Sequence, residues 1–338
     1  MEVSATLWGN MTQGEEIYLF RITNENGAYV ELTNLGATWV SAVVPDRHGI
    51  MGNVLLGYDT AEGYVRDLYY MGATIGRFAN RIDGASFSID GVAYRLERND
   101  GSNTNHGGTS GFSHKLWQWK LVDYGVCFTI TSPDKEGGYP GCVEVSVTFS
   151  WSEKNELTIL YSGYTDKPTY LNLTNHAYFN LTARDGEIID HILMIPSNRM
   201  LDTTSRFIPT GAYRLIDNTP FDFMYPRRLG NHLHDNDSQL LCNHGYNHCY
   251  VLKDVSGDDL LLAAILIEPR WGRRLEVMTT LPSVLLYTAG YYVQPDVAVC
   301  LEAQYLPDSP HHPHFPSCLL LPGKQYDERT IFIFKQEH

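Results

Sequence analysis

Hydrophobic and polar residues alternate with a period of two over long stretches of the chain. The clearest stretch is 143–151, where Val, Val, Val, Phe and Trp at the odd positions alternate with Glu, Ser, Thr and Ser. Because successive side chains of a strand point to opposite faces, this pattern predicts a strand with one buried face. A turn at 152–155, followed by Leu157, Ile159 and Tyr161, predicts an antiparallel return strand.

Turn residues divide the rest of the chain into short strands. Asp90-Gly91 lies between two apolar stretches, 87–89 and 92–96, and this pair favours the positive φ angles of a tight hairpin turn. Most windows long enough for a helix contain one of the 29 glycines, one of the 16 prolines or a β-branched alternation. We therefore expect an all-β fold, a large antiparallel β-sandwich that residues 1–338 form as a single domain.

The composition limits the expected partners and compartment. Apolar residues make up 43% of the chain, enough for a large core, and the net charge of −14 would repel phosphate backbones and anionic lipids. We expect neither nucleic acid nor membrane as a partner, whereas an uncharged sugar is compatible with this field. Residues 1–10 lack the features of a secretory signal, and the longest apolar run, 260–267, is too short to span a bilayer. Six cysteines without a C-x-x-C spacing indicate free thiols and a cytoplasmic protein.

Four segments place ionisable or amide side chains in apolar or glycine-rich surroundings, and each has an ordinary structural explanation. Glu302 follows the apolar run 297–301, where a carboxylate is costly unless it is paired or used, and a Glu bonded to Tyr or Arg is the commoner case. His176 equally fits a core histidine bonded to backbone. His106 precedes two glycines, which fits either a turn that presents the imidazole to a ligand or a plain surface turn. Arg81 could pair with any carboxylate.

In chain order, however, these segments resemble the aldose 1-epimerases, also called galactose mutarotases. The resemblance covers most of the chain, from about Leu35 to the final strand. It rests on GATIGR running on to NRI at 72–82, NHGG at 105–108, NHAYFN at 175–180, LE at 301–302 through PDSP at 307–310, FPS at 315–317 and LPG at 321–323.

The resemblance implies one β-supersandwich of the galactose-mutarotase type with a cleft for a sugar substrate, and neither a cofactor nor a metal. It further implies that Glu302 is the general base and His176 the general acid. His106, Asn80 and Arg81 would bind and orient the sugar, with His106 near the ring oxygen.

The chemistry of mutarotation requires few groups. A proton leaves the C1 hydroxyl, another reaches the ring oxygen, the C1–O5 bond opens, and the ring closes after rotation about C1–C2. One carboxylate and one imidazolium on opposite sides of the C1–O5 unit suffice. Reference pKa values of about 4.3 for Glu and about 6.5 for His predict usable states near neutrality, and a nearby carboxylate would favour the charged imidazole.

Two positions depart from the family pattern. Asn247 stands where the family usually has an Asp that contacts a sugar hydroxyl, and Leu285 stands where family members often have Gln. Both positions belong to sugar binding rather than proton transfer. We therefore expect the anomerase chemistry to hold, but we do not expect galactose to be the preferred sugar.

Three other functions compete with this interpretation. A relative acting on a phosphorylated or otherwise modified hexose would need an arginine cluster, for which the candidates are Arg227, Arg228, Arg270, Arg273 and Arg274. A non-catalytic carbohydrate-binding protein of the same fold would not need Glu302 and His176 together. A glycosidase would need two carboxylates, and one is well placed here.

A histidine-rich loop is the remaining motif. His311, His312 and His314 are interleaved with prolines, and no carboxylate or cysteine completes a usual ligand spacing, so we do not expect a metal site there. Neither the preferred sugar, nor the oligomeric state, nor the pathway follows from the sequence.

Overall fold

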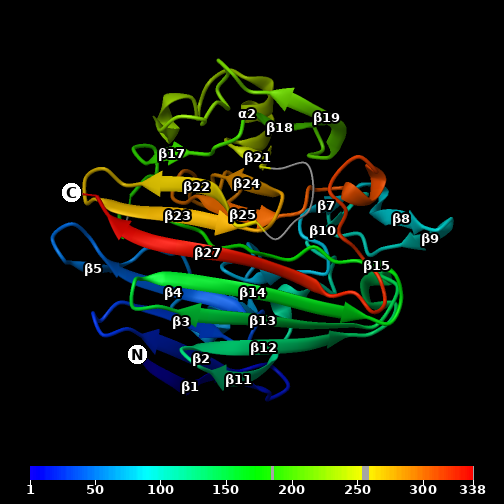
Figure 1. Ribbon diagram of the computed structural model, residues 1–338, viewed down its shortest axis with the longest axis horizontal. Coiled ribbons are helices and arrows are strands. Elements are labelled where there is room, and N and C mark those ends of the chain that lie inside the picture. Colours follow the sequence, from blue (N-terminus) through cyan, green and yellow to red (C-terminus); the bar gives the residue numbers. More distant parts are fainter. Residues whose placement is uncertain (184–185, 253–258, 338) are drawn as a thin grey trace.

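Antiparallel β-sheets form nearly all of the regular structure in this computed structural model, which describes residues 1–183, 186–252 and 259–337. Three sheets are large, with the orders β1-β2-β3-β4-β5, β11-β12-β13-β14-β27-β23-β22-β17-β20 and β19-β18-β21-β24-β25. The pairings between their neighbouring strands are all antiparallel in the described part of the chain. In Figure 1 the nine-stranded sheet runs across the molecule, with the N-terminal five-stranded sheet behind its lower part.

The strands of the three large sheets have the following bounds. The N-terminal sheet contains β1 (Glu2–Asn10), β2 (Glu16–Thr23), β3 (Tyr29–Thr33), β4 (Thr38–Pro45) and β5 (Met51–Asn53). The nine-stranded sheet contains β11 (Gln118–Val122), β12 (Gly125–Ser132), β13 (Val143–Trp151), β14 (Glu156–Thr165), β17 (Ile192–Met194), β20 (Arg227–Arg228), β22 (Leu261–Ile267), β23 (Arg273–Thr279) and β27 (Tyr326–Gln336). The third sheet contains β18 (Arg199–Thr203), β19 (Pro209–Leu215), β21 (Asn247–Val251), β24 (Ser283–Tyr287) and β25 (Cys300–Gln304).

Four small two-stranded pairs occur among the described residues, and all but the hairpin β8–β9 join segments that are separated along the sequence. They are β6 (Thr74–Ile75) with β16 (Thr174–Asn175), β7 (Arg81–Ile82) with β10 (Thr104–Asn105), β8 (Ser86–Ile89) with β9 (Val92–Arg95), and β15 (Thr169–Tyr170) with β26 (Leu319–Leu320). The first two pairs bring the motif segments around residues 76, 105 and 176 together.

Helical structure is brief among the described residues. Two α-helices occur, α1 (Ala61–Val65) and α2 (Ser238–Asn243), with five 3₁₀ turns: η1 (Asp83–Ala85), η2 (Phe112–His114), η3 (Glu136–Gly138), η4 (Leu229–Asn231) and η5 (Ser309–His311). Within the ranges described, none of the helices has the length and apolar character that crossing a membrane requires.

The predicted strands are confirmed. β13 is buried at its odd positions and more exposed at the even ones, and β14 pairs with it in the expected antiparallel manner. The hairpin β8–β9 turns at Asp90 and Gly91, with φ angles of 51° and 80°. The expectation of free thiols is also confirmed, because all six cysteines are unpaired.

One cluster of buried apolar side chains reaches all three large sheets. It contains Phe20 of β2, Phe332 of β27 and Leu301 of β25. The Trp39 ring links the N-terminal sheet to the nine-stranded sheet, since its centroid lies 5.1 Å from that of Phe332. The sheets are therefore packed around a shared core that includes Leu301 of β25, the strand that carries Glu302.

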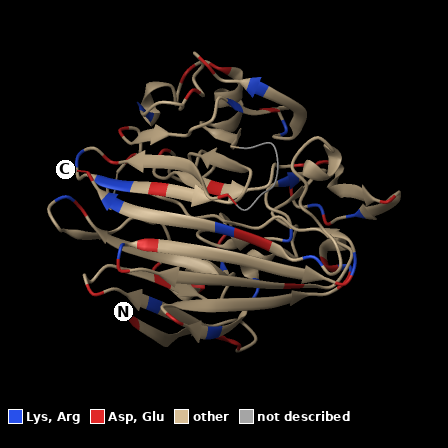
Figure 2. Ribbon diagram, viewed as in Figure 1, with Lys and Arg blue, Asp and Glu red and all other residues tan. Residues whose placement is uncertain are grey.

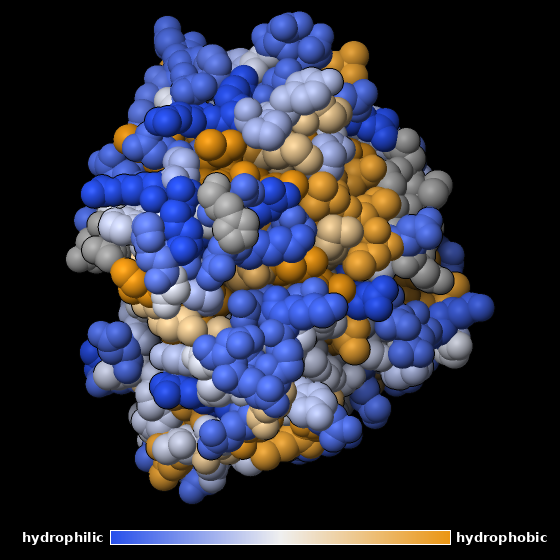
Figure 3. All heavy atoms as spheres, turned by 60° about the vertical axis from the view of Figure 1, so that its left-hand side comes forward, coloured by the Kyte–Doolittle hydropathy of each residue, from blue (hydrophilic) through white to orange (hydrophobic). Residues whose placement is uncertain are grey.

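Charged residues of both signs are spread along the chain, whereas apolar side chains gather on one face of the molecule. Figure 2 shows acidic and basic residues interspersed at strand ends and in loops rather than gathered in a block of one sign. On the face seen in Figure 3, a broad hydrophobic area is surrounded by hydrophilic side chains.

Candidate active site

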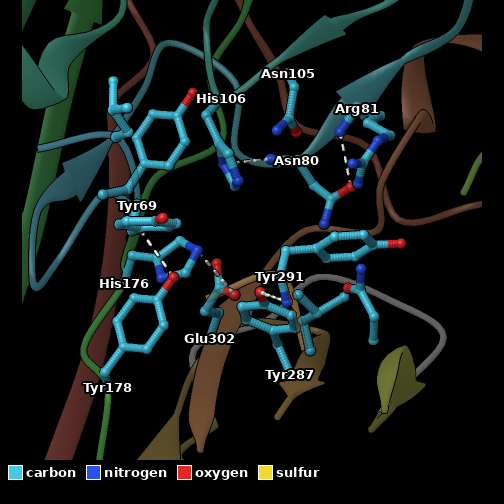
Figure 4. Close-up of a pocket in the computed structure, with 14 residues that line it drawn as sticks. Tyr69, Asn80, Arg81, Asn105, His106, His176, Tyr178, Tyr287, Tyr291 and Glu302 are labelled. Carbon is cyan, nitrogen blue, oxygen red and sulfur yellow. Dashed lines mark hydrogen bonds and ion pairs between the residues drawn. The ribbon is translucent and has the colours of Figure 1, made fainter. Parts of the chain in front are cut away.

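All seven residues predicted for the site line a single pocket of about 200 Å³ (Figure 4). They come from six separate segments of the chain: Asn80, Arg81, His106, His176, Asn247, Leu285 and Glu302. The pairs β6–β16 and β7–β10 and the sheet β21-β24-β25 bring them to one place. The volume is of the size that a single monosaccharide ring requires.

Glu302 lies at the centre of β25, which is buried along its whole length. The side chain is 1% exposed, and neither carboxylate oxygen has a hydrogen-bond partner among the described residues. Burial raises the pKa of Glu302 to about 8, with Arg81 acting in the opposite direction. An unpaired buried carboxyl group is costly, which is typical of a group kept for chemistry.

His176 follows β16 and is held between aromatic rings. Its backbone amide donates to the carbonyl of Ala73 at 3.0 Å, and its imidazole stacks on Tyr178 at a centroid distance of 5.0 Å and on Tyr70 at 6.0 Å. Its Nε2 lies 3.7 Å from Oε1 of Glu302. The two candidate proton-transfer groups therefore face each other at the wall of the pocket, as Figure 4 shows.

The expected protonation states differ from those found. The sequence argument placed both pKa values near their reference values and expected the carboxylate to favour the charged imidazole. Burial instead lowers the pKa of His176 to about 4, while that of Glu302 rises to about 8. Between these values the pair holds one proton, and in the free protein that proton resides on Glu302.

His106 is presented to the pocket by a strained turn. The residue has a φ of 51°, and the two following glycines have φ of 86° and 83°. A Cβ on Gly107 would lie 2.1 Å from the carbonyl oxygen of Gly76, so this close approach requires glycine. The backbone amide of Asn80 donates to Nδ1 of His106 at 3.2 Å, and burial keeps the pKa of His106 well below its usual value. His106 is therefore neutral with its proton on Nε2.

Two contacts hold the guanidinium group of Arg81 in place. Its Nε donates to Asp100 at 2.7 Å, and its guanidinium lies 4.9 Å from the ring centroid of Phe207. Its backbone amide donates to the side-chain oxygen of Asn80 at 2.8 Å. The Nε–H is thus committed to Asp100, which leaves the two terminal nitrogens as the donors that a sugar hydroxyl can use.

Leu285 lies on the strand next to that of Glu302, and Asn247 lies one strand further away in the same sheet. Leu285 on β24 is directly opposite Glu302 on β25, and Asn247 on β21 is opposite Tyr287 on β24. The Leu285 side chain is 5% exposed and forms an apolar wall beside the carboxyl group. This wall removes a polar neighbour from Glu302 and is part of the surroundings in which its pKa is raised.

The sequence analysis missed the aromatic part of the pocket. Tyr69, Tyr70, Tyr178, Tyr287 and Tyr291 all line it, together with Leu68 and Asn105. Tyr178 and Asn105 lie inside motifs already singled out, and Tyr287 lies in the segment that contains Leu285. The abundance of tyrosine, 22 residues, was the available signal, but it does not tell which rings face a ligand.

Two histidines of the histidine-rich loop contact one carboxylate. Nδ1 of His311 lies 2.7 Å from one carboxylate oxygen of Asp308, and Nε2 of His312 lies 3.4 Å from the other. The backbone amide of Asp308 donates to the carbonyl of Arg81 at 2.9 Å. In the described part of the chain, no group of three His, Cys, Asp or Glu side chains is arranged to hold a metal ion. The loop instead supports the segment that carries Arg81.

The arginines considered for a phosphate group lie away from the pocket. Arg227 donates to the carbonyl of Pro220, Arg228 pairs with Asp190, and Arg274 pairs with Glu276. Of the five candidates, none appears among the described pocket-lining residues. An antiparallel β-sandwich that brings one buried carboxyl group and two imidazoles to a sugar-sized pocket has the features of an acid–base enzyme acting on a carbohydrate.

Comparison with known proteins identifies the family. The family model for aldose 1-epimerase matches residues 18–332. A galactose mutarotase from Bos taurus is 38% identical and covers 90% of both chains. An aldose 1-epimerase from Escherichia coli (strain K12) is 32% identical and covers 96% of this chain and 97% of that protein. The solved structure of an aldose epimerase homologue from C. elegans superposes with a TM-score of 0.86 at 27% identity, covering 94% of this chain and 98% of that one.

The chain belongs to the aldose 1-epimerase family. It is an isomerase with aldose 1-epimerase (mutarotase) activity, which interconverts the α and β anomers of an aldose. The predicted all-β, galactose-mutarotase-like fold is confirmed by the solved structures, which include a galactose 1-epimerase from Lactobacillus acidophilus with a TM-score of 0.87.

Proposed function

We propose that Glu302 is the general base and His176 the general acid of anomer interconversion, with His106, Asn80 and Arg81 orienting the sugar. The observation that carries this proposal is the 3.7 Å approach of His176 Nε2 to Glu302 Oε1 in the wall of one pocket. O1 and O5 of an aldose are both bonded to C1, so two proton-transfer groups this close together can serve both oxygens from one side. This differs from the expected placement on opposite sides of the C1–O5 unit, because a 3.7 Å gap leaves no room for the sugar between the two groups.

The proton balance supports a reaction that returns the protein to its starting state. The carboxylate of Glu302 takes the proton of the C1 hydroxyl while the imidazolium of His176 gives its proton to O5, and the C1–O5 bond breaks as the C1 carbonyl forms. After rotation about C1–C2, the reverse transfers close the ring on the other carbonyl face. The neutral pair and the ion pair both hold one proton, so the two forms differ only in where it resides.

A free aldose, rather than a phosphorylated hexose, fits the pocket better. Arg81 is the one cationic side chain among the described lining residues, and its Nε is already bonded to Asp100. A phosphate would need several uncommitted donors. The same lining contains a single carboxyl group, that of Glu302, so a glycosidase mechanism lacks its second carboxylate in the described pocket.

The preferred sugar is proposed to be an aldose other than galactose. Curated relatives are named galactose mutarotases, but Asn247 carries no charge and Leu285 no hydrogen-bonding group. A sugar that presents a C–H face toward Leu285 would lose less binding free energy than one that buries a hydroxyl there without a hydrogen-bond partner. The free thiols, the acidic charge balance and the activity together support a cytoplasmic role in hexose metabolism without nucleic-acid partners.

Polarimetry of freshly dissolved α-D-glucose, α-D-galactose and other free aldoses tests the assignment of Glu302. Glu302→Gln keeps the shape of the side chain but cannot accept the proton, so turnover should fall about 10²–10⁴-fold. Glu276→Gln on β23, outside the pocket lining, is the matched control and should turn over normally. Normal turnover by the Glu302 variant would remove this residue from the mechanism.

The histidines are tested in the same assay. His176→Asn should show a loss comparable to that of Glu302→Gln, because an amide cannot deliver a proton at neutral pH. His106→Asn should lower turnover and weaken binding together, since a neutral Nε2–H orients the sugar rather than donating its proton. Normal rates in both variants would mean that the proton for O5 comes from elsewhere.

No step of the proposed reaction requires a Lewis acid, so EDTA should leave turnover unchanged. A loss of turnover in EDTA that Zn²⁺ restores would contradict this.

A further inference from the structure

Cys300 is a buried side chain that the reaction described so far does not use. It lies two residues before Glu302 on β25, so both side chains point to the same face of the strand. The residue is fully buried, and its Sγ lies 3.7 Å from Nδ1 of His176. The carboxyl group and the thiol of one strand therefore contact the two nitrogens of one imidazole.

The orientation of the His176 ring is already fixed by its neighbours. The rings of Tyr70 and Tyr178 stack on it with interplanar angles of 24° and 21°, and the ring of His106 meets it nearly perpendicularly at 5.4 Å. With the ring plane fixed, the open question is which nitrogen carries the proton of the neutral ring. One nitrogen of a neutral imidazole donates and the other accepts.

The groups around Nδ1 include acceptors, since the sulfur of Cys300 can accept a hydrogen bond as well as donate one weakly. Besides Sγ of Cys300, the backbone of His176 itself favours the protonated form of its ring and acts to raise the pKa. The backbone carbonyl of His176 accepts the amide of Gly72 at 2.9 Å and keeps a second lone pair. On the other side of the ring, Nε2 faces Oε1 of Glu302, where the free protein holds the proton of the pair.

We propose that Cys300 is a positioning residue whose sulfur accepts the Nδ1–H of His176, so that Nε2 is left as an open acceptor facing Glu302. The two pocket histidines then hold opposite tautomers, because the amide of Asn80 donates to Nδ1 of His106 and places that proton on Nε2. His106 offers a donor to the sugar, whereas His176 offers a lone pair to the carboxyl group.

This arrangement accounts for how the catalytic ion pair forms. The O–H bond of Glu302 breaks and an N–H bond forms at Nε2 of His176, which yields the carboxylate base and the imidazolium acid in one transfer. No outside proton is needed. With the opposite tautomer, Nε2 would already carry a hydrogen and could not receive the proton from Glu302. The proposal rests on the proposed roles of Glu302 and His176.

Nitrogen-15 NMR of histidine-labelled protein at neutral pH reads the tautomers directly through two-bond and three-bond ¹H–¹⁵N correlations. His176→Asn and His106→Asn assign the two rings by the signals that disappear. We expect the Nδ1–H pattern for His176 and the Nε2–H pattern for His106 in the unsubstituted protein. An Nε2–H pattern for His176 overturns the proposal whatever the variants do.

Substitution of the sulfur tests its contribution. Cys300→Ala removes one acceptor, so kcat should fall about 3- to 10-fold, with KM unchanged, and the Nδ1–H signal should weaken. The acid limb of the pH profile should also move to lower pH, because the imidazolium loses a partner. Cys300→Ser keeps an acceptor and should retain the tautomer and most of the turnover.

A matched control separates these effects from the simple loss of a buried thiol. Cys127 is buried on β12, outside the pocket lining, so Cys127→Ala should leave kcat, the pH profile and the tautomer of His176 unchanged. A Cys300→Ala protein with an unchanged tautomer contradicts the proposal even when its turnover falls. If Cys300→Ala fails to fold, the tautomer of His176 in the unsubstituted protein and in Cys300→Ser still tests the proposal. Full turnover in His176→Asn would refute the role of His176 as acid without altering the tautomer result.

Discussion

Glu302 and His176 hold a single proton across the neutral range because burial moves their pKa values apart, to about 8 and about 4. Below the lower value both groups are protonated and the base is lost. Above the upper value neither group carries a proton and the acid is lost. We therefore expect kcat/KM to follow a bell-shaped profile with a broad plateau and limbs near those two values.

The profile is measured with a free aldose after subtraction of the uncatalysed mutarotation at each pH. A limb near about 6.5, the reference value of histidine, would indicate a solvated imidazole and contradict the buried pair. The Cys127→Ala protein, which alters no group in the pocket lining, serves as the reference for the shape of the profile.

Glu302 also makes stability depend on pH. Because its pKa is raised to about 8 from a usual 4.5, the folded protein binds a proton that the unfolded chain has lost between those values. The free energy of unfolding contributed by this group is therefore fully present below the lower value and falls as pH rises through the upper one. Glu302→Gln removes this dependence and should be more stable than the unsubstituted protein in mildly alkaline buffer.

Urea unfolding of both proteins at acid and at mildly alkaline pH measures this difference. The two should be similar where Glu302 is protonated and should differ by an amount on the order of a few kcal/mol where it is ionised. Equal stability at the alkaline pH would show that the carboxylate is compensated in the pocket.

The sequence predicted a set of candidate residues that share one pocket, whereas it did not predict their protonation. Long motifs in a fixed order pointed to Glu302, His176 and His106, and each lines the pocket. Burial depends on what the fold packs around a side chain, and Leu285 and the stacked tyrosines around these groups come from other segments. Tyr70, with a φ of 60° in a loop, had no pattern that marked it.

At the scale of elements, the alternating strands were predictable and the short ones were not. β13 shows the expected alternation of burial, but β24 and β25 are buried on both faces and show none. The two-residue strands β6, β7, β10 and β16 are too short to leave a periodic pattern, although they assemble the site. Their pairing is decided by contacts between distant segments.

Strands β21 and β24 carry the two positions, 247 and 285, that depart from the family pattern. The residues at these positions lead to a prediction of the preferred sugar. An Asp at position 247 would accept two charge-assisted hydrogen bonds from sugar hydroxyls, and a Gln at position 285 would add a polar contact. Asn247→Asp with Leu285→Gln should therefore improve kcat/KM for galactose relative to the better native substrate. Each regained contact is worth about 0.5–1.5 kcal/mol, or more for the charged one.

The register of these strands adds a second readout. Because Leu285 is opposite Glu302, Leu285→Gln should place a hydrogen-bond donor beside the carboxyl group, favour its ionised form and move the alkaline limb of the pH profile downward. Asn247→Asp alone should not move that limb in the same direction, since a nearby negative charge raises a carboxyl pKa. A native protein that already handles galactose best, and that both substitutions only impair, would contradict this account of specificity.

At the scale of the whole molecule, we propose that residues 1–338 form one folding domain. The buried cluster that includes Phe20, Leu301 and Phe332 draws side chains from all three large sheets, and the ring of Trp39 packs against Phe179 and Phe332 at centroid distances of 5.6 and 5.1 Å. A sheet that unfolded alone would expose the apolar face of its neighbour, so the sheets should unfold together.

Calorimetry with and without a saturating aldose measures this cooperativity. A single transition is expected, with the calorimetric enthalpy equal to the van't Hoff enthalpy, and the ligand should raise the midpoint of the whole transition because the pocket takes residues from β7, β21, β24 and β25. The Glu302→Gln protein, which should still bind the sugar, allows the ligand shift to be measured without turnover. Two separable transitions, with only one moved by the sugar, would divide the chain into independent domains.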